Sequence, residues 1–510
     1  MRKLCRVLFS RYAISAVMIC LEVVIFTLLC IYALPSLYIV AVICALAAIC
    51  ALISLINRDA NPEYKIPWAV IIIMIPALGP LMYLLFYKRR MSRKEAHRLT
   101  EIIGAVNSAE RANEAFDSLE RGSEVKGKAR AILNDDSLSG VYRGTNSKLY
   151  FSGEELFADM ISDLRAARQY IFMEYFIIDQ GKLWDEIHGI LREKAAMGVD
   201  VRLLYDDIGC MKTLPSHYET GLLREGIKTC RFAKVNPRVS SVHHNRDHRK
   251  ICVIDGKAAY TGGVNIADEY VNIIDRFGHW RDGGVRLEGS AVIGLLKLFL
   301  ASWDFTSGED SDYKALFETV SPSEKADGGY CIPFGSGPAP IYKRPAGKNA
   351  FLNIINQAER YVYITTPYLI IDYELTQALC NAAQRGVEVR IVTPSRADKR
   401  IIKILTKSSY PYLLDAGVKI SEYVPGFIHE KTLVSDDEYA VIGTINFDYR
   451  SFVHHYEDAV WMYNTDAVIT ARKEYEKLLE STEQMNRKKS RLTFSEWLFK
   501  IGIRLFAPLL

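Results

Sequence analysis

The 510-residue sequence lacks paired cysteines, and it lacks a strong net charge. Its ten cysteines include no C-x-x-C pair; five lie within the first fifty residues and the others are scattered singly. Neither a disulfide framework nor a cysteine zinc site is therefore indicated. The formal net charge is only +4, and no groove-like alternation of aromatic and basic residues is present. Both features argue against a nucleic-acid-binding protein.

Hydrophobic residues make up 49% of the chain, and they are concentrated in its first ninety residues. Each of three apolar runs there is about long enough to cross a hydrocarbon core of roughly 30 Å as a helix. A cleaved signal peptide is the alternative for the first run, but a second run follows at once. We therefore expect residues 1–90 to be a membrane segment with two or three helices. The runs are 12–33, 37–56 and 66–87.

The third apolar run contains Pro76, Gly79 and Pro80, which predict a kinked or re-entrant helix. Basic residues flank the membrane segment on both sides, and both clusters favour the cytoplasm. Three full spans cannot satisfy both clusters. We expect a multi-pass protein of the cell membrane whose catalytic part faces the cytoplasm, because the second cluster is larger. The clusters are Arg2, Lys3, Arg6 and Arg11, and Lys88, Arg89, Arg90, Arg93, Lys94 and Arg98.

A charged connector, 91–145, leads into a sequence that repeats itself. Each copy has an apolar strand pattern, a helical stretch and a second β-branched strand, which predicts two α/β halves with layered sheets. We place the halves at 146–330 and 331–485, with a Pro/Gly-rich boundary near 333–348. The matching segments are "YIFMEYFIID" (170–179) with "YVYITTPYLIID" (361–372), and "MGVDVRLLYDD" (197–207) with "RGVEVRIVTP" (385–394).

Each half carries the same polar motif, H-x-K-x-x-x-x-D followed by glycine and asparagine. Residues two apart on a strand share a face, so the His and Lys of each motif point the same way. Each Asp falls in a turn signal, where a structural role is at least as plausible as a chemical one. The candidate residues are His248, Lys250, Asp255 and Asn265 in the first half, and His429, Lys431, Asp436 and Asn446 in the second.

This set of residues suits a phosphodiester substrate. Lysine supplies positive charge to phosphoryl oxygens, and asparagine supplies directed donors. Histidine can act as a nucleophile or as a general acid near neutral pH. Two sets that face one another across a pseudo-twofold cleft would allow one His to attack phosphorus while the other protonates the leaving oxygen. This scheme requires no metal and no cofactor.

The paired motifs resemble the phospholipase D superfamily, and further blocks resemble the bacterial cardiolipin synthases within it. These blocks are "NRDHRK", "GGVNIADEY", "WRD", "GFIHEK" and "GTINFDYRSF", together with the region that begins "NRDANPEYKIPW". The resemblance runs from about residue 57 to the end of the chain. It implies a pseudo-twofold unit of two phospholipase D-like α/β/α half-domains, preceded by transmembrane helices.

The resemblance also implies a reaction. One phosphatidylglycerol donates its phosphatidyl group to an enzyme His and releases glycerol, and a second phosphatidylglycerol then accepts the group to give cardiolipin. We expect His248 to be the nucleophile and His429 the acid/base. An acid supports each His in the family, and by position we expect Glu457 to serve His429 and Asp282 to serve His248; a surface salt bridge is the alternative for both.

The sequence departs from the family pattern in one place. After "DYRSF" the family usually has an apolar residue and an Asn before the supporting acid, whereas this chain has His454 and His455. This change leaves the acceptor preference open. A zinc site at His243, His244 and His248 matches no usual ligand spacing, and Lys250 would repel a cation.

Residues 486–510 combine regularly spaced apolar residues with basic ones. They predict either a basic amphipathic helix on an anionic bilayer or a helix packed on the protein body.

Three alternative functions remain at this stage. Water as acceptor would make the protein a phospholipase, and another alcohol would give a different phospholipid. A membrane scaffold built on an inactive duplicate is the non-enzymatic alternative.

Overall fold

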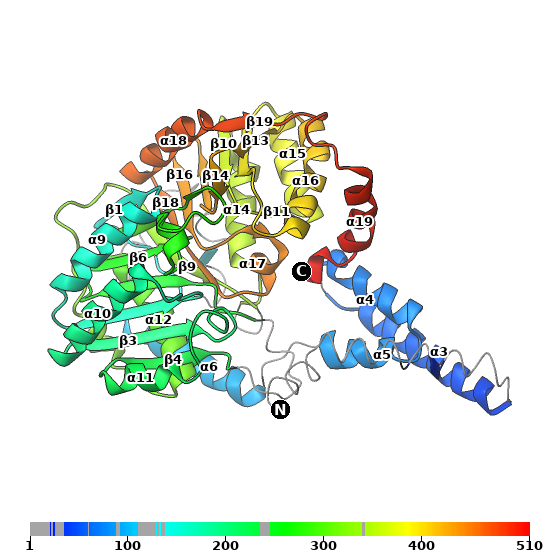
Figure 1. Cartoon of the computed structure of the whole chain (residues 1–510), viewed down its shortest axis with the longest axis horizontal. Helices are drawn as coiled ribbons and strands as arrows, with labels where there is room; N and C mark the ends of the chain where they lie inside the picture. Colours follow the sequence, from blue (N-terminus) through cyan, green and yellow to red (C-terminus); the bar gives the residue numbers. More distant parts are fainter. Residues whose placement is uncertain are drawn as a thin grey trace. The chain divides into compact units, whose positions relative to one another are not determined.

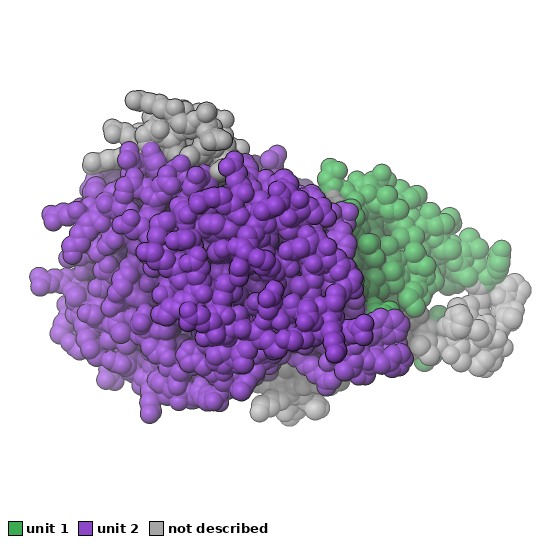
Figure 2. All heavy atoms as spheres, turned by 90° about the horizontal axis from the view of Figure 1, so that it is seen from above, with its two compact units in different colours: residues 1–91, 235–244, 501–510 green, residues 92–234, 245–500 purple. Residues whose placement is uncertain are grey.

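The computed structural model describes residues 35–59, 61–87, 92–110, 138–234, 245–338 and 342–509, with residues 21, 24, 25, 129, 132 and 133. They fall into two compact units (Figure 2). The smaller unit comprises the described residues within 1–91 and 501–510, and the larger unit comprises those within 92–234 and 245–500.

One long apolar helix, α3 (Pro35–Ile56), dominates the smaller unit. Its stretch Tyr38–Ile56 has a mean hydropathy of 3.1, and only 17% of its apolar window is buried. Within the described residues, α3 is the helix long and apolar enough to cross a membrane. The expected first span, 12–33, and the basic residues Arg2 to Arg11 lie almost entirely outside the described residues.

The third apolar run is broken where Pro76 and Gly79 predict a kink. Helix α4 (Pro62–Met74) ends first, and the chain continues as α5 (Gly79–Met82) and the π-helical turn η1 (Tyr83–Tyr87). A side chain at Gly79 would place a Cβ 2.7 Å from the carbonyl oxygen of Ile71, so only glycine fits there. Leu55 of α3, Trp68 of α4 and Tyr83 pack together and hold these helices side by side.

Two mixed β-sheets with flanking helices form the larger unit (Figure 1). The first has strand order β1-β8-β6-β5-β2-β3-β4, and the second β19-β13-β12-β10-β15-β16-β18-β9. The segment β8-β6-β5-β2-β3-β4 corresponds strand for strand to β18-β16-β15-β10-β12-β13, with the same parallel and antiparallel pairings. The predicted fold class, a duplicated α/β unit, is confirmed.

The strands of the first half are β1 (Thr145–Tyr150), β2 (Tyr170–Tyr175), β3 (Asp200–Asp206), β4 (Lys228–Phe232), β5 (Lys250–Ile254), β6 (Ala258–Gly262), β7 (His279–Arg281) and β8 (Gly284–Gly289). Those of the second are β9 (Tyr330–Ser336), β10 (Tyr361–Thr365), β11 (Leu369–Ile370), β12 (Glu388–Pro394), β13 (Lys419–Tyr423), β14 (Gly426–Ile428), β15 (Thr432–Ser435), β16 (Tyr439–Gly443), β17 (Phe447–Asp448), β18 (Glu457–Tyr463) and β19 (Thr482–Gln484).

The helices of the larger unit are α6 (Arg93–Ala109), α9 (Gly153–Ala166), α10 (Lys182–Ala196), α11 (Tyr218–Arg224), η3 (Asp268–Val271), α12 (Val292–Ser307), α13 (Tyr313–Phe317), α14 (Ala346–Gln357), α15 (Tyr373–Gln384), α16 (Arg400–Asp415), α17 (Tyr449–Val453) and α18 (Asp466–Leu479). Helix α19 (Phe494–Arg504) and the 3-10 turn η4 (Ala507–Leu509) end the chain.

Central strand β2 is buried on both faces, and its sequence is apolar apart from the buried Glu174. Ile171 and Met173 join a core with residues of α9 and α10. On the other face Phe172 stacks on Phe299 of α12, with ring centres 5.0 Å apart. Helices therefore cover both faces of the sheet and leave its strand ends free to carry polar groups.

The motif aspartates Asp255 and Asp436 brace these sheets at the turns that end β5 and β15. Asp255 and Gly256 both have positive φ, and the Lys257 N–H closes their turn by donating to the carbonyl oxygen of Ile254 at 2.9 Å. The Asp255 carboxylate accepts hydrogen bonds from the backbone N–H groups of Arg168, Gln169 and Tyr170 at 2.7–2.9 Å. Asp436 does the same for residues 359–361. The turn interpretation therefore fits both aspartates.

We predict that Asp255→Ala lowers the free energy of unfolding by about 3 kcal/mol, because three N–H groups lose their acceptor. Turnover per folded molecule should stay at the wild-type level. Thermal melts and activity assays of the purified protein check this, with the exposed Lys257→Ala in the same turn as the control. A stable but inactive Asp255→Ala protein would instead give Asp255 a chemical role.

Candidate active site

Both motif histidines lie at the carboxyl end of the parallel strands, where open α/β sheets usually bind ligands. Lys250, the first residue of β5, pairs with Tyr175, the last residue of β2. His248, two residues earlier, therefore lies just beyond this edge. Strands β10 and β15 repeat the arrangement, with His429 between β14 and β15.

Backbone hydrogen bonds cross between the halves at each histidine. The His248 N–H donates to the carbonyl oxygen of Tyr456 at 2.8 Å, and the His429 N–H donates to that of Arg281 at 2.7 Å. Strands β7 and β14 pair in parallel at the second crossing, and Asp247 bridges to Tyr456 at the first. Each half thus holds the other half's histidine by its backbone.

This crossing decides which acid serves which histidine. His248 Nδ1 lies 2.9 Å from Glu457 Oε2, and His429 Nδ1 lies 2.7 Å from Asp282 Oδ2. The expected pairing, Glu457 with His429 and Asp282 with His248, is therefore wrong. The residue just before each acid bonds the histidine of the other half, so the acid's side chain reaches that histidine and not the one in its own half.

Burial controls the charge of both pairs. It lowers the pKa of His248 to about 3 and that of His429 to about 4, and nearby lysines act in the same direction. Burial alone would raise the pKa of Glu457 and Asp282, but the paired histidines, joined at Asp282 by Lys431 and the Gly283 N–H, outweigh it and lower both. An ionised acid at Nδ1 fixes the Nδ1–H tautomer and leaves the Nε2 lone pair available. Each histidine is therefore held in its nucleophilic form.

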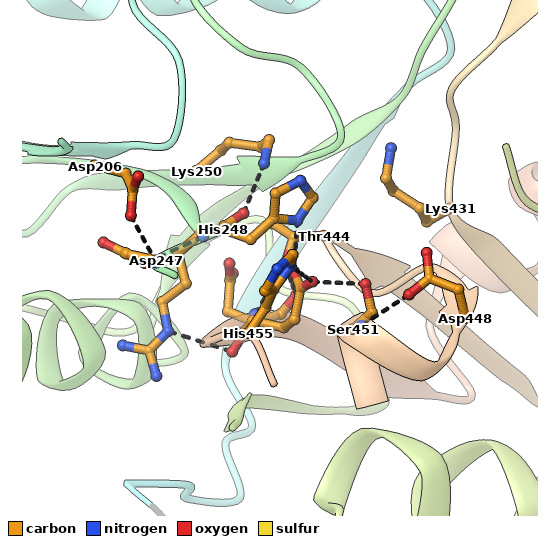
Figure 3. A network of polar contacts seen from close by, with 12 residues as sticks. Asp206, Asp247, His248, Lys250, Lys431, Thr444, Asp448, Ser451 and His455 are labelled. Atoms are coloured by element: carbon orange, nitrogen blue, oxygen red, sulfur yellow. Dashed lines mark hydrogen bonds and ion pairs between the residues drawn. The ribbon is translucent and has the colours of Figure 1, made fainter. Parts of the chain in front are cut away.

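Glu457 accepts further hydrogen bonds that sequence reasoning did not identify. Thr444 Oγ1 donates to Oε2 at 2.5 Å, and Ser451 Oγ donates to Oε1 at 2.7 Å (Figure 3). Both donors lie within the "GTINFDYRSF" block, and this block is the sequence signal that could have identified them. They fix the orientation of the carboxylate that positions His248.

The motif lysines, Lys250 and Lys431, are buried. Figure 3 shows Lys250 beside His248. Lys250 Nζ donates to the carbonyl oxygen of His248 at 2.6 Å, and Lys431 Nζ lies 2.8 Å from His429 Nδ1. Burial lowers the pKa of Lys250 to about 8 and that of Lys431 to about 7. The charge of Lys250 also lowers the pKa of Lys431 and of His429, so both halves share one electrostatic site.

The two motif asparagines are not equivalent. Asn265 accepts from the Ile177 N–H at 3.1 Å and donates to the Tyr270 hydroxyl at 2.7 Å. The Oδ1 of Asn446 is buried and has no hydrogen-bond partner among the described residues. Asn265 is thus tied into the fold, whereas Asn446 retains free bonding capacity.

Asp255 and Asp436 lie outside this site. Each follows the far end of a strand that begins at the motif lysine (β5) or directly after it (β15), and the five residues from lysine to aspartate span roughly 16 Å. The structure therefore separates these two predicted catalytic residues from the other motif positions and assigns them to the turns.

One group of side chains in the described part of the chain has the composition of a cation site. Nitrogen and oxygen atoms of His248, His455 and Glu457 lie within 4.8 Å of one another. Both oxygens of Glu457 already accept from His248, Thr444 and Ser451, which favours a proton-transfer role over metal ligation. His243 and His244 lie outside the described residues.

Two protein-family descriptions match this chain. "Cardiolipin synthase, PLD-like domain" matches residues 160–274 and 351–479, one segment in each half. "Phospholipase_D-nuclease N-terminal" matches residues 46–86. The paired segments contain His248 and His429 with their lysines.

Among curated relatives, an uncharacterized protein of Streptococcus mutans is 38% identical over 90% of this chain and 99% of its own. A cardiolipin synthase of Halalkalibacterium halodurans is 34% identical over 90% of this chain and 91% of its own. A solved phosphatidylserine synthase of Haemophilus influenzae has a TM-score of 0.58 at 14% identity, covering 75% of this chain and 98% of its own. That structure supports the fold alone.

We predict that Glu457→Gln reduces turnover by about 10³–10⁴-fold, because a neutral amide no longer fixes the tautomer of His248 or stabilises its charged form. Steady-state rates of purified protein at matched folded concentration check this. Glu438→Gln, an exposed carboxylate in the β15–β16 turn, is the control and should match the wild type. Near-normal turnover of Glu457→Gln would contradict the crossed assignment.

Proposed function

This chain belongs to the cardiolipin synthase family of phospholipase D-like proteins, and on that premise we propose that it joins two phosphatidylglycerol molecules into cardiolipin, releasing glycerol. Relatives with this name span about nine-tenths of the chain at 32–34% identity. The observation that carries the proposal is the pair of buried histidine–acid groups, one from each half and each beside a lysine. The protein is thus a phosphatidyltransferase.

In the first step, the Nε2 lone pair of neutral His248 attacks the phosphorus of one phosphatidylglycerol. A P–N bond forms while the P–O bond to the headgroup glycerol breaks. Binding of the anionic phosphodiester favours the protonated form of His429, which Asp282 also stabilises. The leaving oxygen takes this proton from His429, and glycerol departs.

In the second step, a headgroup hydroxyl of another phosphatidylglycerol attacks the same phosphorus and passes its proton to His429. The new P–O bond forms as the P–N bond breaks, which returns the lone pair to His248. Each step is a displacement at one phosphorus, and no net proton is gained or lost.

We assign Lys250 and Lys431 to the phosphoryl oxygens, together with Asn446. The support for the two lysines is electrostatic. Both are buried cations with lowered pKa values, so an incoming anion stabilises their charged forms. Asn265 would act chiefly by holding its loop, since Ile177 and Tyr270 already bond its side chain.

A lipid acceptor favours a site tethered to the membrane. We propose that the protein is a multi-pass membrane protein with its catalytic unit on the cytoplasmic side, anchored in part by α3. The basic residues Arg93, Lys94 and Arg98 after the membrane segment support this orientation.

We also propose that α19 lies on the anionic bilayer surface. None of its residues is buried, which favours the lipid-surface alternative over packing on the protein body. Phe494 is 77% exposed, and Trp497, Leu498 and Ile501 on the same face are exposed as well. Lys500 and Arg504 supply the charge that anionic lipids attract.

We predict that purified protein converts phosphatidylglycerol vesicles to cardiolipin with one glycerol released per cardiolipin. His248→Ala and His429→Ala should each abolish this product, because the first variant lacks the nucleophile and the second lacks the acid that both steps need. Lipid chromatography and glycerol assay measure the outcome. Phosphatidic acid as the main product would identify a hydrolase, and no turnover would favour another acceptor or a scaffold.

We predict that anionic bilayers protect α19 from trypsin at Lys500 and Arg504, whereas zwitterionic bilayers do not. The comparison uses full-length protein reconstituted in either lipid, with fragments identified by mass spectrometry. Cleavage at Lys325, in an exposed loop of the catalytic unit, is the internal control. Equal cleavage in both lipids would count against surface binding.

A further inference from the structure

Tyr270 packs against the histidine of the other half and has no part in the steps described above. It belongs to η3 of the first half, and its side chain is buried. Its ring centre lies 5.6 Å from that of His429, with the two rings nearly perpendicular at 79°, and 4.5 Å from that of Trp280. A phenol of the first half thus adjoins the histidine that serves as acid/base in the proposed reaction.

The hydrogen bonds of Asn265 determine how the Tyr270 hydroxyl is used. Asn265 Oδ1 accepts from the Ile177 N–H at 3.1 Å, which fixes the orientation of the amide. Asn265 Nδ2 therefore faces Tyr270 and donates to its hydroxyl oxygen at 2.7 Å. The proton of this hydroxyl has no acceptor among the described residues. Because buried donors in folded proteins are almost always paired, the hydroxyl is a ready donor for a ligand.

The duplicated half carries a hydroxyl at the same distance from its motif asparagine. Tyr270 stands five residues after the asparagine of the first half, and Ser451 stands five residues after that of the second. Ser451 Oγ donates to Glu457 Oε1 at 2.7 Å and so supports the acid. Asp282, the corresponding acid, accepts instead from Trp280 Nε1 at 3.4 Å. The Tyr270 hydroxyl is thereby left for a role other than support of the acid.

The position of Tyr270 matches one part of the proposed substrate. His429 exchanges a proton with an alcohol oxygen in both steps, so that oxygen must come within hydrogen-bond reach of its imidazole. In both steps the neighbouring hydroxyl on the adjacent carbon is the central hydroxyl of glycerol. This oxygen enters a buried site beside His429, where it needs a hydrogen-bond partner. The motif lysines and Asn446 are assigned to the phosphoryl oxygens, which leaves Tyr270 for the alcohol.

We propose that the Tyr270 hydroxyl donates to the alcohol group adjacent to the reacting oxygen, and that it thereby selects an acceptor with hydroxyls on adjacent carbons over water or a simple alcohol. The proposal rests on the proposed transferase function and assigns the origin of its acceptor specificity. Water carries no adjacent hydroxyl, so hydrolysis would leave this buried donor unpaired.

Tyr270 binds the alcohol and takes no part in the proton transfers. Burial raises the pKa of its phenol, and the nearby charge of Asp282 raises it further, so the group stays neutral. In the second step the attacking hydroxyl passes its proton to His429, while Tyr270 keeps its own proton. The effect of Tyr270 therefore lies in the choice between acceptors.

The experiment supplies the protein in phosphatidylglycerol vesicles with equal concentrations of ethylene glycol and ethanol, which differ by the adjacent hydroxyl alone. Both alcohols compete for the same phosphorylated histidine, so the ratio of the two phosphatidylalcohol products gives the ratio of their kcat/KM values. The wild type should favour ethylene glycol about tenfold beyond the statistical factor of two for its equivalent hydroxyls, as one buried hydrogen bond produces. Lipid chromatography measures both products.

Tyr270→Phe keeps the ring against His429 and removes the hydroxyl, so its product ratio should fall close to the statistical value. Tyr175→Phe is the matched control, because it removes the hydroxyl of another buried tyrosine, one that faces Met160 in the core of the same half. Its product ratio should equal that of the wild type. A purely structural defect would lower both products together and leave their ratio unchanged.

The same product ratio in the wild type and in Tyr270→Phe would overturn the proposal, as would a wild type with no preference beyond the statistical value. Tyr270→Met, which also lacks a donor, is the second variant if Tyr270→Phe does not fold, as judged by thermal melting. Failure of the proposed function is distinguishable, because the wild type would then form neither cardiolipin nor a phosphatidylalcohol. A wild type that makes cardiolipin without a preference for the diol would reject only the role of Tyr270.

Discussion

This active site depends on the hydrogen bonds that each half donates to, and accepts from, the other half at the two motif histidines. The backbone N–H of each motif histidine donates to the half that also supplies its acid. These two hydrogen bonds fix the position of the imidazole, and the neighbouring carboxylate fixes its tautomer. If the contacts between the halves shifted by one residue, the side chains at each crossing would point to the opposite face. Each histidine would then be separated from its acid.

Burial then determines the protonation states of the residues in this site. Four ionisable groups from the two motifs, His248, Lys250, His429 and Lys431, are buried in one site, and burial lowers the pKa of each. The site is therefore electrostatically unfavourable for cations, and an anionic phosphodiester would relieve this cost. The same environment keeps the histidines neutral and nucleophilic, so substrate binding and nucleophile activation have a common physical origin.

Much of this arrangement could be predicted from the sequence, because local patterns determined it. Strand alternation, the repeated motifs and the turn glycines predicted the duplicated α/β fold, and Pro76 and Gly79 predicted the broken third apolar run. The crossed acids could not be predicted, since proximity in sequence favours a partner in the same half and only the contact between halves reverses this. Asp255 and Asp436 belong to the same sequence motif as the catalytic residues, which suggested a shared site. They lie instead at the opposite ends of the strands.

The crossed pairs also bear on how such a chain arose. A single half contains a histidine and an acid that cannot meet each other, so an ancestor of one half's length would have needed two copies to assemble one complete pair. Fusion of the two copies made that encounter intramolecular and independent of protein concentration. It also allowed each copy to change alone: the residue two positions before the supporting acid is Trp280 in the first half and His455 in the second.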